Sequence, residues 1–278
     1  MRMSVRDFQK MKHDGVPITM ITAYDATSAR LSEMAGIPAM LVGDSLGMVM
    51  QGHDVTIPVT LDDIIYHARI VTRVTSKAFV AGDLPFMTYT ISPEQAMHSA
   101  ARLMQEAGVS AVKLEGGESI APTIKRLVEA GIPVMGHIGL QPQSVYKLGG
   151  MKAQGRDLES ARQLLADAEA VEQAGAFAMV IEAVPAALAQ MISQRLEIPT
   201  IGIGAGVHCD GQVQIFHDLL GLFEEFVPRH TRRYATLADT ARGALSAYRT
   251  DVESRAFPTD EQSFSIREEV MTELRKAD

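Results

Sequence analysis

At residues 130–137 the sequence reads Ala-Gly-Ile-Pro-Val-Met-Gly-His, a stretch that ends one secondary-structure element and begins another. A glycine after a helix adopts the left-handed conformation that ends it, and a proline just beyond prevents the helix from continuing. The apolar residues that follow have the length and composition of a buried strand. The same type of junction recurs at residues 35–38, 107–109 and 174–176. The chain is therefore expected to alternate helices with strands.

Short apolar runs without polar alternation mark the predicted strands, as is typical of strands buried on both faces of a parallel sheet. Helical patterns lie between these runs. Ser92 followed by Pro93, and Thr60 before another apolar stripe, have the composition of helix N-termini. The predicted strands cover residues 18–22, 39–42, 79–82, 111–114, 134–137, 178–181, 200–203 and 214–216.

Eight strands alternating with helices predict an α/β fold, a (β/α)₈ TIM barrel, because parallel strands require crossover helices. A doubly wound sheet is the alternative. We expect residues 1–249 to form one barrel domain, since no linker divides them, with a further amphipathic helix over 236–248. Residues 250–278 are polar and form a predicted C-terminal extension, either a mobile appendage or a subunit-contact arm.

Composition excludes several classes of protein. The chain has 278 residues with 26 Lys+Arg and 34 Asp+Glu, a net charge of −8, and no basic cluster, so nucleic acid is not an expected partner. The only cysteine is Cys209, which excludes an intrachain disulfide and indicates a reducing compartment. The N-terminus lacks the apolar segment of a signal peptide, and no apolar run approaches the roughly 20 residues that span a bilayer. We therefore expect a soluble, cytoplasmic protein without a membrane contact.

Acidic residues dominate the ends of the predicted strands, where (β/α)₈ barrels carry their reactive groups. Several acids at one rim raise one another's pKa unless a cation is bound, so a hard divalent ion, Mg²⁺ by default, is the economical interpretation. Each Asp taken alone can instead be a helix N-cap, and His137 alone can be structural. The residues in question are Tyr24, Asp25, Asp44, Ser45, Asp83, Glu115, His137, Glu182, His217 and Asp218.

Three further features of the sequence each allow more than one interpretation. Strand alternation places Lys113 on the same face as Glu115, and a buried lysine there requires a salt bridge or an anionic ligand. The glycines of residues 201–206 resemble a phosphate cradle, but they lack the setting of a dinucleotide site and can simply permit a tight turn. Cys209 lies near them without partners for nucleophilic catalysis, which favours a structural role.

Taken together, the strand-end motifs resemble those of the ketopantoate hydroxymethyltransferase family. The matching motifs, in order, are TAYDA (22–26), VGDSLG (42–47), GDLPF (82–86), VKLEGG (112–117), GHIGL (136–140), IGIGAG (201–206) and CDGQ (209–212). The resemblance implies a barrel of the phosphoenolpyruvate/pyruvate superfamily type that assembles as a homodecamer. It also implies transfer of a hydroxymethyl group from 5,10-methylenetetrahydrofolate to 2-oxoisovalerate, giving ketopantoate and tetrahydrofolate, the first committed step of pantothenate synthesis.

The resemblance also implies roles for individual residues. Asp44 and Asp83 correspond to the Mg²⁺ ligands, with Glu115 completing the metal site directly or through water. Glu182 corresponds to the catalytic base. The implied substrate-binding residues are Asp44, Ser45, Asp83, Lys113 and His137.

Two other functions are compatible with parts of this pattern. A Mg²⁺-dependent lyase or phosphonomutase of the same superfamily also acts on a 2-keto acid or its enol, but the lyases are expected to carry a cysteine in a lid loop, and none is found here. A catalytically silent barrel that serves as a binding module would leave no reason for Lys113, Glu115 and Glu182 to share one rim.

Overall fold

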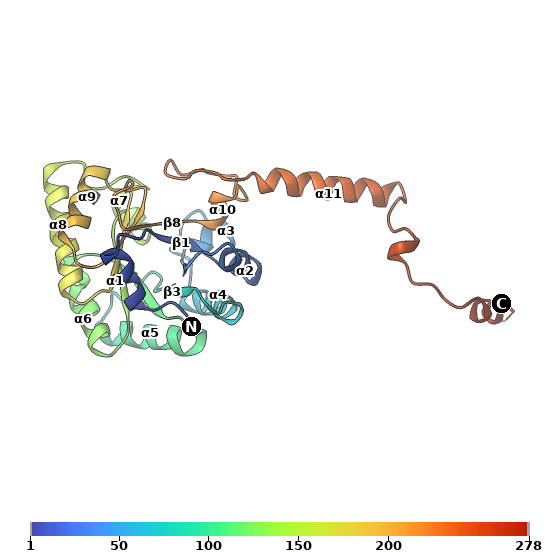
Figure 1. Cartoon of the computed structure of the whole chain (residues 1–278), viewed down its shortest axis with the longest axis horizontal. Coiled ribbons are helices and arrows are strands. Elements are labelled where there is room, and N and C mark those ends of the chain that lie inside the picture. The colour runs from blue at the N-terminus through green and yellow to red at the C-terminus, as the bar shows by residue number, and fades with distance from the viewer. Residues whose placement is uncertain (1, 277–278) are drawn as a thin grey trace.

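Eight parallel strands close into a barrel in sequence order, with the last strand paired to the first (Figure 1). The structure is a computed structural model, and it describes residues 2–276. The closed order confirms the predicted barrel and excludes the doubly wound sheet. The strands are β1 (Ile18–Thr22), β2 (Ala39–Val42), β3 (Phe79–Asp83), β4 (Ala111–Glu115), β5 (Val134–Gly139), β6 (Ala178–Glu182), β7 (Thr200–Ile203) and β8 (Gly211–Gln214).

The prediction for the eighth strand was wrong. It was placed at residues 214–216, whereas β8 ends at Gln214 and Phe216 begins a short helix. β8 begins with Gly211, where an added Cβ would lie 2.3 Å from the Ile18 carbonyl oxygen of β1. Closing the barrel therefore requires a glycine at the start of β8. The strand also alternates Gln212 and Gln214 with Val213, whereas the prediction relied on a continuous apolar run.

Helices surround the barrel and follow the predicted caps. Ser92 accepts a hydrogen bond from the backbone N–H of Gln95, and Thr60 accepts one from that of Asp63. The helices are α1 (Val5–His13), α2 (Ala26–Met34), α3 (Leu46–Val49), α4 (Leu61–Val74), α5 (Pro93–Ala107), α6 (Ala121–Glu129), α7 (Val145–Leu148), α8 (Leu158–Gln173), α9 (Ala186–Arg195), α10 (Phe216–Leu219), α11 (Leu237–Glu253) and α12 (Glu268–Lys276), with 3₁₀ turns at Glu118–Ile120, Pro142–Ser144 and Asp260–Gln262.

The N-terminal end of the barrel is closed by α1. Phe8 of this helix is fully buried, and its ring packs edge-on against Phe79, at 4.9 Å between centroids, and against Phe177, at 5.4 Å. A second, larger apolar cluster fills the space between the strands and the surrounding helices. The open end of the barrel is therefore the one that carries the carboxyl ends of the strands.

The last two helices project away from the barrel (Figure 1). None of the residues of α11 or α12 is buried. α11 runs through the expected boundary between residues 249 and 250, and the division into a barrel and an extension stays a prediction. Among residues 2–276, no helix is both long enough and apolar enough to cross a membrane.

Candidate active site

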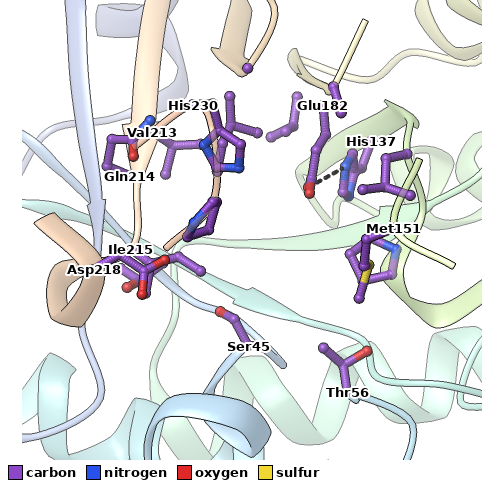
Figure 2. Close-up of a pocket in the computed structure, with 18 of the residues that line it drawn as sticks. Ser45, Thr56, His137, Met151, Glu182, Val213, Gln214, Ile215, Asp218 and His230 are labelled. Atoms are coloured by element: carbon purple, nitrogen blue, oxygen red, sulfur yellow. Dashed lines mark ion pairs between the residues drawn. The ribbon is translucent and has the colours of Figure 1, made fainter. Parts of the chain in front are cut away.

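A cavity of about 850 Å³ opens at the carboxyl ends of the strands. Every residue that the sequence singled out for substrate, metal or catalysis lines it, and Figure 2 shows Ser45, His137 and Glu182 around its interior. Three of these strands are one residue longer than predicted. Each therefore ends on its acidic residue, namely Asp83, Glu115 or Glu182, rather than just before it. The residues gathered here are Asp44, Ser45, Asp83, Lys113, Glu115, His137 and Glu182.

Lys113 forms an ion pair with Asp83 inside the barrel. The two residues are register partners on β4 and β3, and Lys113 Nζ lies 2.7 Å from Asp83 Oδ1. Burial favours the neutral amine, but the charges of Asp83, Glu115 and Asp44 outweigh it and raise the pKa of Lys113. Lys113 is therefore a cation facing the cavity, and its predicted need for a salt bridge is met by Asp83 rather than by Glu115 on its own strand.

Asp44 and Asp83 resist ionisation. Asp83 Oδ2 accepts a hydrogen bond of 3.0 Å from the backbone N–H of Asp44. The pKa of Asp44 is raised well above its usual value by burial and by the charges of Asp83 and Glu115. Burial also raises the pKa of Asp83, although Lys113 and the Asp44 N–H act in the opposite direction. The two carboxylates lie close together where little water can stabilise their charges, so the ionisation of both is unfavourable.

Gln143 links two of these carboxylates, and the sequence analysis did not identify it. Its Nε2 donates to Asp44 Oδ2 at 2.8 Å, and its backbone N–H donates to Glu115 Oε2 at 3.1 Å. The hydroxyl of Tyr89 donates to Gln143 Oε1 at 2.9 Å, which fixes the orientation of the amide. Neither residue follows a strand directly, so no pattern in a single sequence distinguishes them from loop residues.

His137 lies between two carboxylates. Its Nδ1 lies 3.4 Å from Glu115 Oε1, and its Nε2 lies 3.2 Å from Glu182 Oε2, the ion pair drawn in Figure 2. Burial and the charge of Lys113 act to lower the pKa of His137, but Glu115 and Glu182 outweigh them and raise it to about 9. Burial acts to raise the pKa of Glu115, but His137 and Lys113 outweigh it, so that this pKa is lowered. The Nδ1 of His137 also lies 3.3 Å from Lys113 Nζ, so the ring contacts a cation as well as two carboxylates.

Tyr24 belongs to the site, whereas Asp25 does not. The Tyr24 hydroxyl lies 2.7 Å from Ser45 Oγ, and burial raises the pKa of this fully buried phenol. Asp25 caps α2 by accepting hydrogen bonds from the backbone N–H groups of Thr27 and Ser28. The N-cap interpretation is therefore confirmed for Asp25.

The carboxylate cluster has the donor chemistry that a hard divalent cation prefers. Asp83 Oδ1 and Glu115 Oε1 are buried and receive no directed hydrogen bond from any described residue. Within residues 2–276, however, no group of three or more His, Cys, Asp or Glu side chains is arranged to hold a metal ion. Lys113 and Gln143 instead lie against Asp83 and Asp44. The metal ligands stay a prediction.

The glycines at 202 and 206 are explained by packing. A Cβ on Gly202 would lie 3.0 Å from Cys209 Sγ, and one on Gly206 would lie 2.4 Å from Ala186 Cβ. Cys209 is buried, and burial raises the pKa of its thiol, which makes it a poor nucleophile. These contacts account for the glycines without a bound phosphate and agree with a structural role for Cys209.

Comparisons with known proteins agree with this architecture. The chain is 61% identical over 263 residues to the 3-methyl-2-oxobutanoate hydroxymethyltransferase of Chloroflexus aurantiacus, covering 95% of this chain and 93% of that one. It is 54% identical, over the full length of both chains, to the enzyme of the same name from Gluconacetobacter diazotrophicus. Among solved structures, 2,3-dimethylmalate lyase, a member of the PEP mutase/isocitrate lyase superfamily, matches with a TM-score of 0.59 at 14% identity over all of both chains, which establishes a shared fold.

The family comparison covers nearly the whole barrel and the first part of the C-terminal segment. The sequence model of ketopantoate hydroxymethyltransferase matches residues 2–260, a range that contains every residue of the cavity described above. The chain therefore belongs to the ketopantoate hydroxymethyltransferase family.

Proposed function

We propose that this protein transfers a hydroxymethyl group from 5,10-methylenetetrahydrofolate to 2-oxoisovalerate in a Mg²⁺-dependent reaction, giving ketopantoate and tetrahydrofolate. In the cell this reaction is the first committed step of pantothenate synthesis. The observation that carries the proposal is the presence, in one buried cavity, of a lysine cation, three carboxylates suited to a hard cation, and a histidine-oriented glutamate. Family membership supports the same activity.

Lys113 and Ser45 are the proposed binding groups for the keto acid. Lys113 is 3% exposed and positively charged, so it offsets the negative charge of a carboxylate that leaves water. Ser45 is held by the hydroxyl of Tyr24, which limits the directions in which its own hydrogen bond can point. Together they orient the substrate within the cavity.

Asp44 and Asp83, with Glu115, are the residues that would hold Mg²⁺. A bound Mg²⁺ would act as a Lewis acid on the keto oxygen and stabilise negative charge there. Asp83 Oδ1 and Glu115 Oε1 receive no directed hydrogen bond from a described residue, which is consistent with this role. Gln143 supports the set from outside, because it holds both Asp44 and Glu115.

Glu182 is the proposed base that removes the proton from the tertiary carbon beside the ketone. It is the least buried of the acidic site residues, with 16% of its side chain exposed, and it lies at the end of β6 facing the cavity. The Nε2 of His137 lies 3.2 Å from its carboxylate and fixes its direction. Water hydrolyses the methylene bridge of the folate, breaking its bonds to N5 and N10 and releasing tetrahydrofolate. The enolate forms a carbon–carbon bond with the released one-carbon unit, whose oxygen, supplied by the water, takes up a proton and becomes the new hydroxyl close to His137.

We further propose a cytoplasmic homodecamer that acts on small molecules only. Both properties follow from the family resemblance and from the composition of the chain, whose net charge of −8 disfavours nucleic acid as a partner.

Proton NMR of 2-oxoisovalerate in D₂O tests the proposed reaction. The enzyme is incubated with Mg²⁺, with and without methylenetetrahydrofolate, and compared with a sample containing EDTA. In the two samples that contain Mg²⁺, we expect deuterium to replace the proton on the tertiary carbon, and we expect no replacement in the EDTA sample. A hydroxymethyl signal should appear only where Mg²⁺ and the folate are both present. Exchange without product would reject the folate half of the proposal. The absence of both exchange and product would reject the enolate chemistry and favour a lyase or mutase.

A further inference from the structure

The cavity has a second wall that the keto-acid chemistry leaves unused. A volume of about 850 Å³ lies toward the upper end of the roughly 300–1,000 Å³ that pockets for drug-sized ligands occupy. A five-carbon keto acid fills a small part of it. The remaining wall is formed by the end of β8, by α10 and by residues 223–230, and Figure 2 shows Asp218 across the cavity from His137 and Glu182.

Asp218 is the unexplained charged group of this wall. It is 4% exposed and lines the cavity. The carboxylates of Asp44, Asp83 and Glu115 all accept hydrogen bonds from the protein, but within residues 2–276 no group donates to the carboxylate of Asp218. Burial raises its pKa to about 6, and only the charge of Arg233 opposes this shift. The carboxylate lines the cavity and is not sealed off from it, so a bound ligand can supply the donor that the described residues do not.

The neighbouring groups of this wall suit a planar polar ring with an acidic tail. Phe223 and Phe226 line the cavity and offer flat apolar surfaces, and Gln214 lies beside them with its Oε1 3.3 Å from the donating Thr231 hydroxyl. Arg156 and Arg229 also line the cavity, and both are exposed to solvent. Their guanidinium groups suit the carboxylates of an acidic tail.

We propose that this wall binds the one-carbon donor, with the Asp218 carboxylate accepting two hydrogen bonds from the ring N–H and the exocyclic amino group of the reduced pterin. Arg156 and Arg229 face the carboxylates of the glutamate tail. This assignment rests on the proposed function, because it presumes a folate donor. It places the donor across the cavity from Glu182, with the reacting carbons of both substrates between the two walls.

The test compares Asp218→Asn and Arg229→Gln with Arg195→Gln, which alters an arginine on α9 that pairs with Glu169 and does not line the cavity. The KM of each variant is measured for methylenetetrahydrofolate and for the corresponding methylenetetrahydropterin that lacks the glutamate tail. Deuterium exchange into 2-oxoisovalerate, measured without donor, reports on the keto-acid half of the site. Asn has the size of Asp but presents an N–H₂ group to the amino group of the ring.

We expect Asp218→Asn to raise the KM for both donors by about 10- to 100-fold, the range for losing hydrogen bonds to a charged group, with exchange unchanged. Arg229→Gln should raise the KM only for the donor with the tail, and Arg195→Gln should change neither.

Two results would overturn the proposal. One is an unchanged donor KM in Asp218→Asn. The other is a loss of exchange in that variant as large as its loss of transfer, which indicates a structural role. A wild-type enzyme that exchanges deuterium but makes no hydroxymethyl product contradicts the proposed function itself, and this assignment with it. The two cases are distinguishable, because a wrong function shows as missing product in the wild type, whereas a wrong donor site shows only in the variants.

Discussion

Lys113 keeps its charge inside the barrel because carboxylates surround it. A lone buried lysine would lose its proton, but Asp83 lies 2.7 Å from its Nζ, and the charges of Glu115 and Asp44 act in the same direction. Burial, together with the charges of Asp83 and Glu115, raises the pKa of Asp44. The site therefore holds opposite charges close together, as the proposed binding of an anionic keto acid together with a cation requires.

Replacing Glu182 by Gln should abolish proton removal while sparing substrate binding. Gln keeps the size of the side chain and an oxygen that can face His137, but it cannot take up the proton. We expect the rate of deuterium exchange into 2-oxoisovalerate to fall by about 10²- to 10⁴-fold, with the calorimetric Kd for the keto acid nearly unchanged. Glu129→Gln, on the exposed end of α6, is the control. Exchange in Glu182→Gln at the wild-type rate would remove Glu182 from this role.

Replacing Asp83 by Asn should remove the effect of Mg²⁺ on keto-acid binding. The Asn oxygen can still accept the backbone N–H of Asp44, and Lys113 remains to bind the substrate carboxylate. We expect calorimetric titrations of 2-oxoisovalerate to give the same Kd with and without Mg²⁺ in the variant, but a tighter Kd with Mg²⁺ in the wild type. If Mg²⁺ tightens binding equally in both proteins, Asp83 is not a metal ligand.

Asp218 should lower the stability of the protein at high pH. Its pKa is raised from 3.8 to about 6 by burial, so the ionised form is less favourable in the folded state than in the unfolded state. The resulting loss of stability is complete above pH 6 and vanishes below pH 3.8. Asp218→Asn should therefore raise the free energy of unfolding by about 1–3 kcal/mol at pH 8 and much less at pH 4.

Urea denaturation at the two pH values measures this difference, with the exposed Asp54→Asn as a control that changes neither value. An equal change at pH 8 and pH 4 in Asp218→Asn would show that ionisation of Asp218 plays no part. The comparison of variant with wild type at each pH cancels the titration of all other groups.

At the scale of elements, the junction between β5 and β6 positions two site residues at once. Gly139 ends β5 with φ +93°, and Leu140 donates a backbone hydrogen bond of 2.8 Å to the carbonyl oxygen of Glu182. A Cβ on Gly139 would lie 2.2 Å from that same oxygen. A glycine here lets the backbone of β5 approach the end of β6 closely enough for His137 to reach Glu182.

Gly139→Ala should therefore lower both stability and activity. The matched control is Gly36→Ala, since Gly36 has φ +81° but no atom within 4 Å of an added Cβ. We expect Gly36→Ala to lower the free energy of unfolding by about 1–2 kcal/mol and to leave kcat unchanged. Gly139→Ala should cost more stability and also reduce kcat, because the clash displaces Glu182. Equal losses of stability and unchanged turnover in both variants would contradict this account.

At the scale of the whole molecule, α11 carries apolar side chains that stay largely exposed within residues 2–276. Leu245 and Tyr248 are 66% and 57% exposed, and with Leu237 and Val252 they follow helical spacing along one side. An isolated helix of this length is marginal in water without a partner surface. The expected homo-oligomer would supply such a surface.

Leu245→Glu should therefore reduce the mass of the assembly. Light scattering coupled to size exclusion measures the mass, and Thr250→Glu, away from the apolar side of the same helix, is the control. The circular dichroism spectrum, which reports the helix and strand content, should be the same for both variants and the wild type, because no residue of α11 is buried against the barrel. Equal masses for Leu245→Glu and the wild type would exclude a role of this side of α11 in assembly.

Local chemistry in the sequence determined the alternation of helices and strands, the caps at Ser92 and Thr60, and the ring of acids at the strand ends. These features depend on residues a few positions apart, so they are visible without a fold. Tertiary structure alone decided the bounds of β8 and the pairing of Lys113 with Asp83. It also brought Gln143 to Asp44, 99 positions away, because only closure of the barrel places such distant segments in contact.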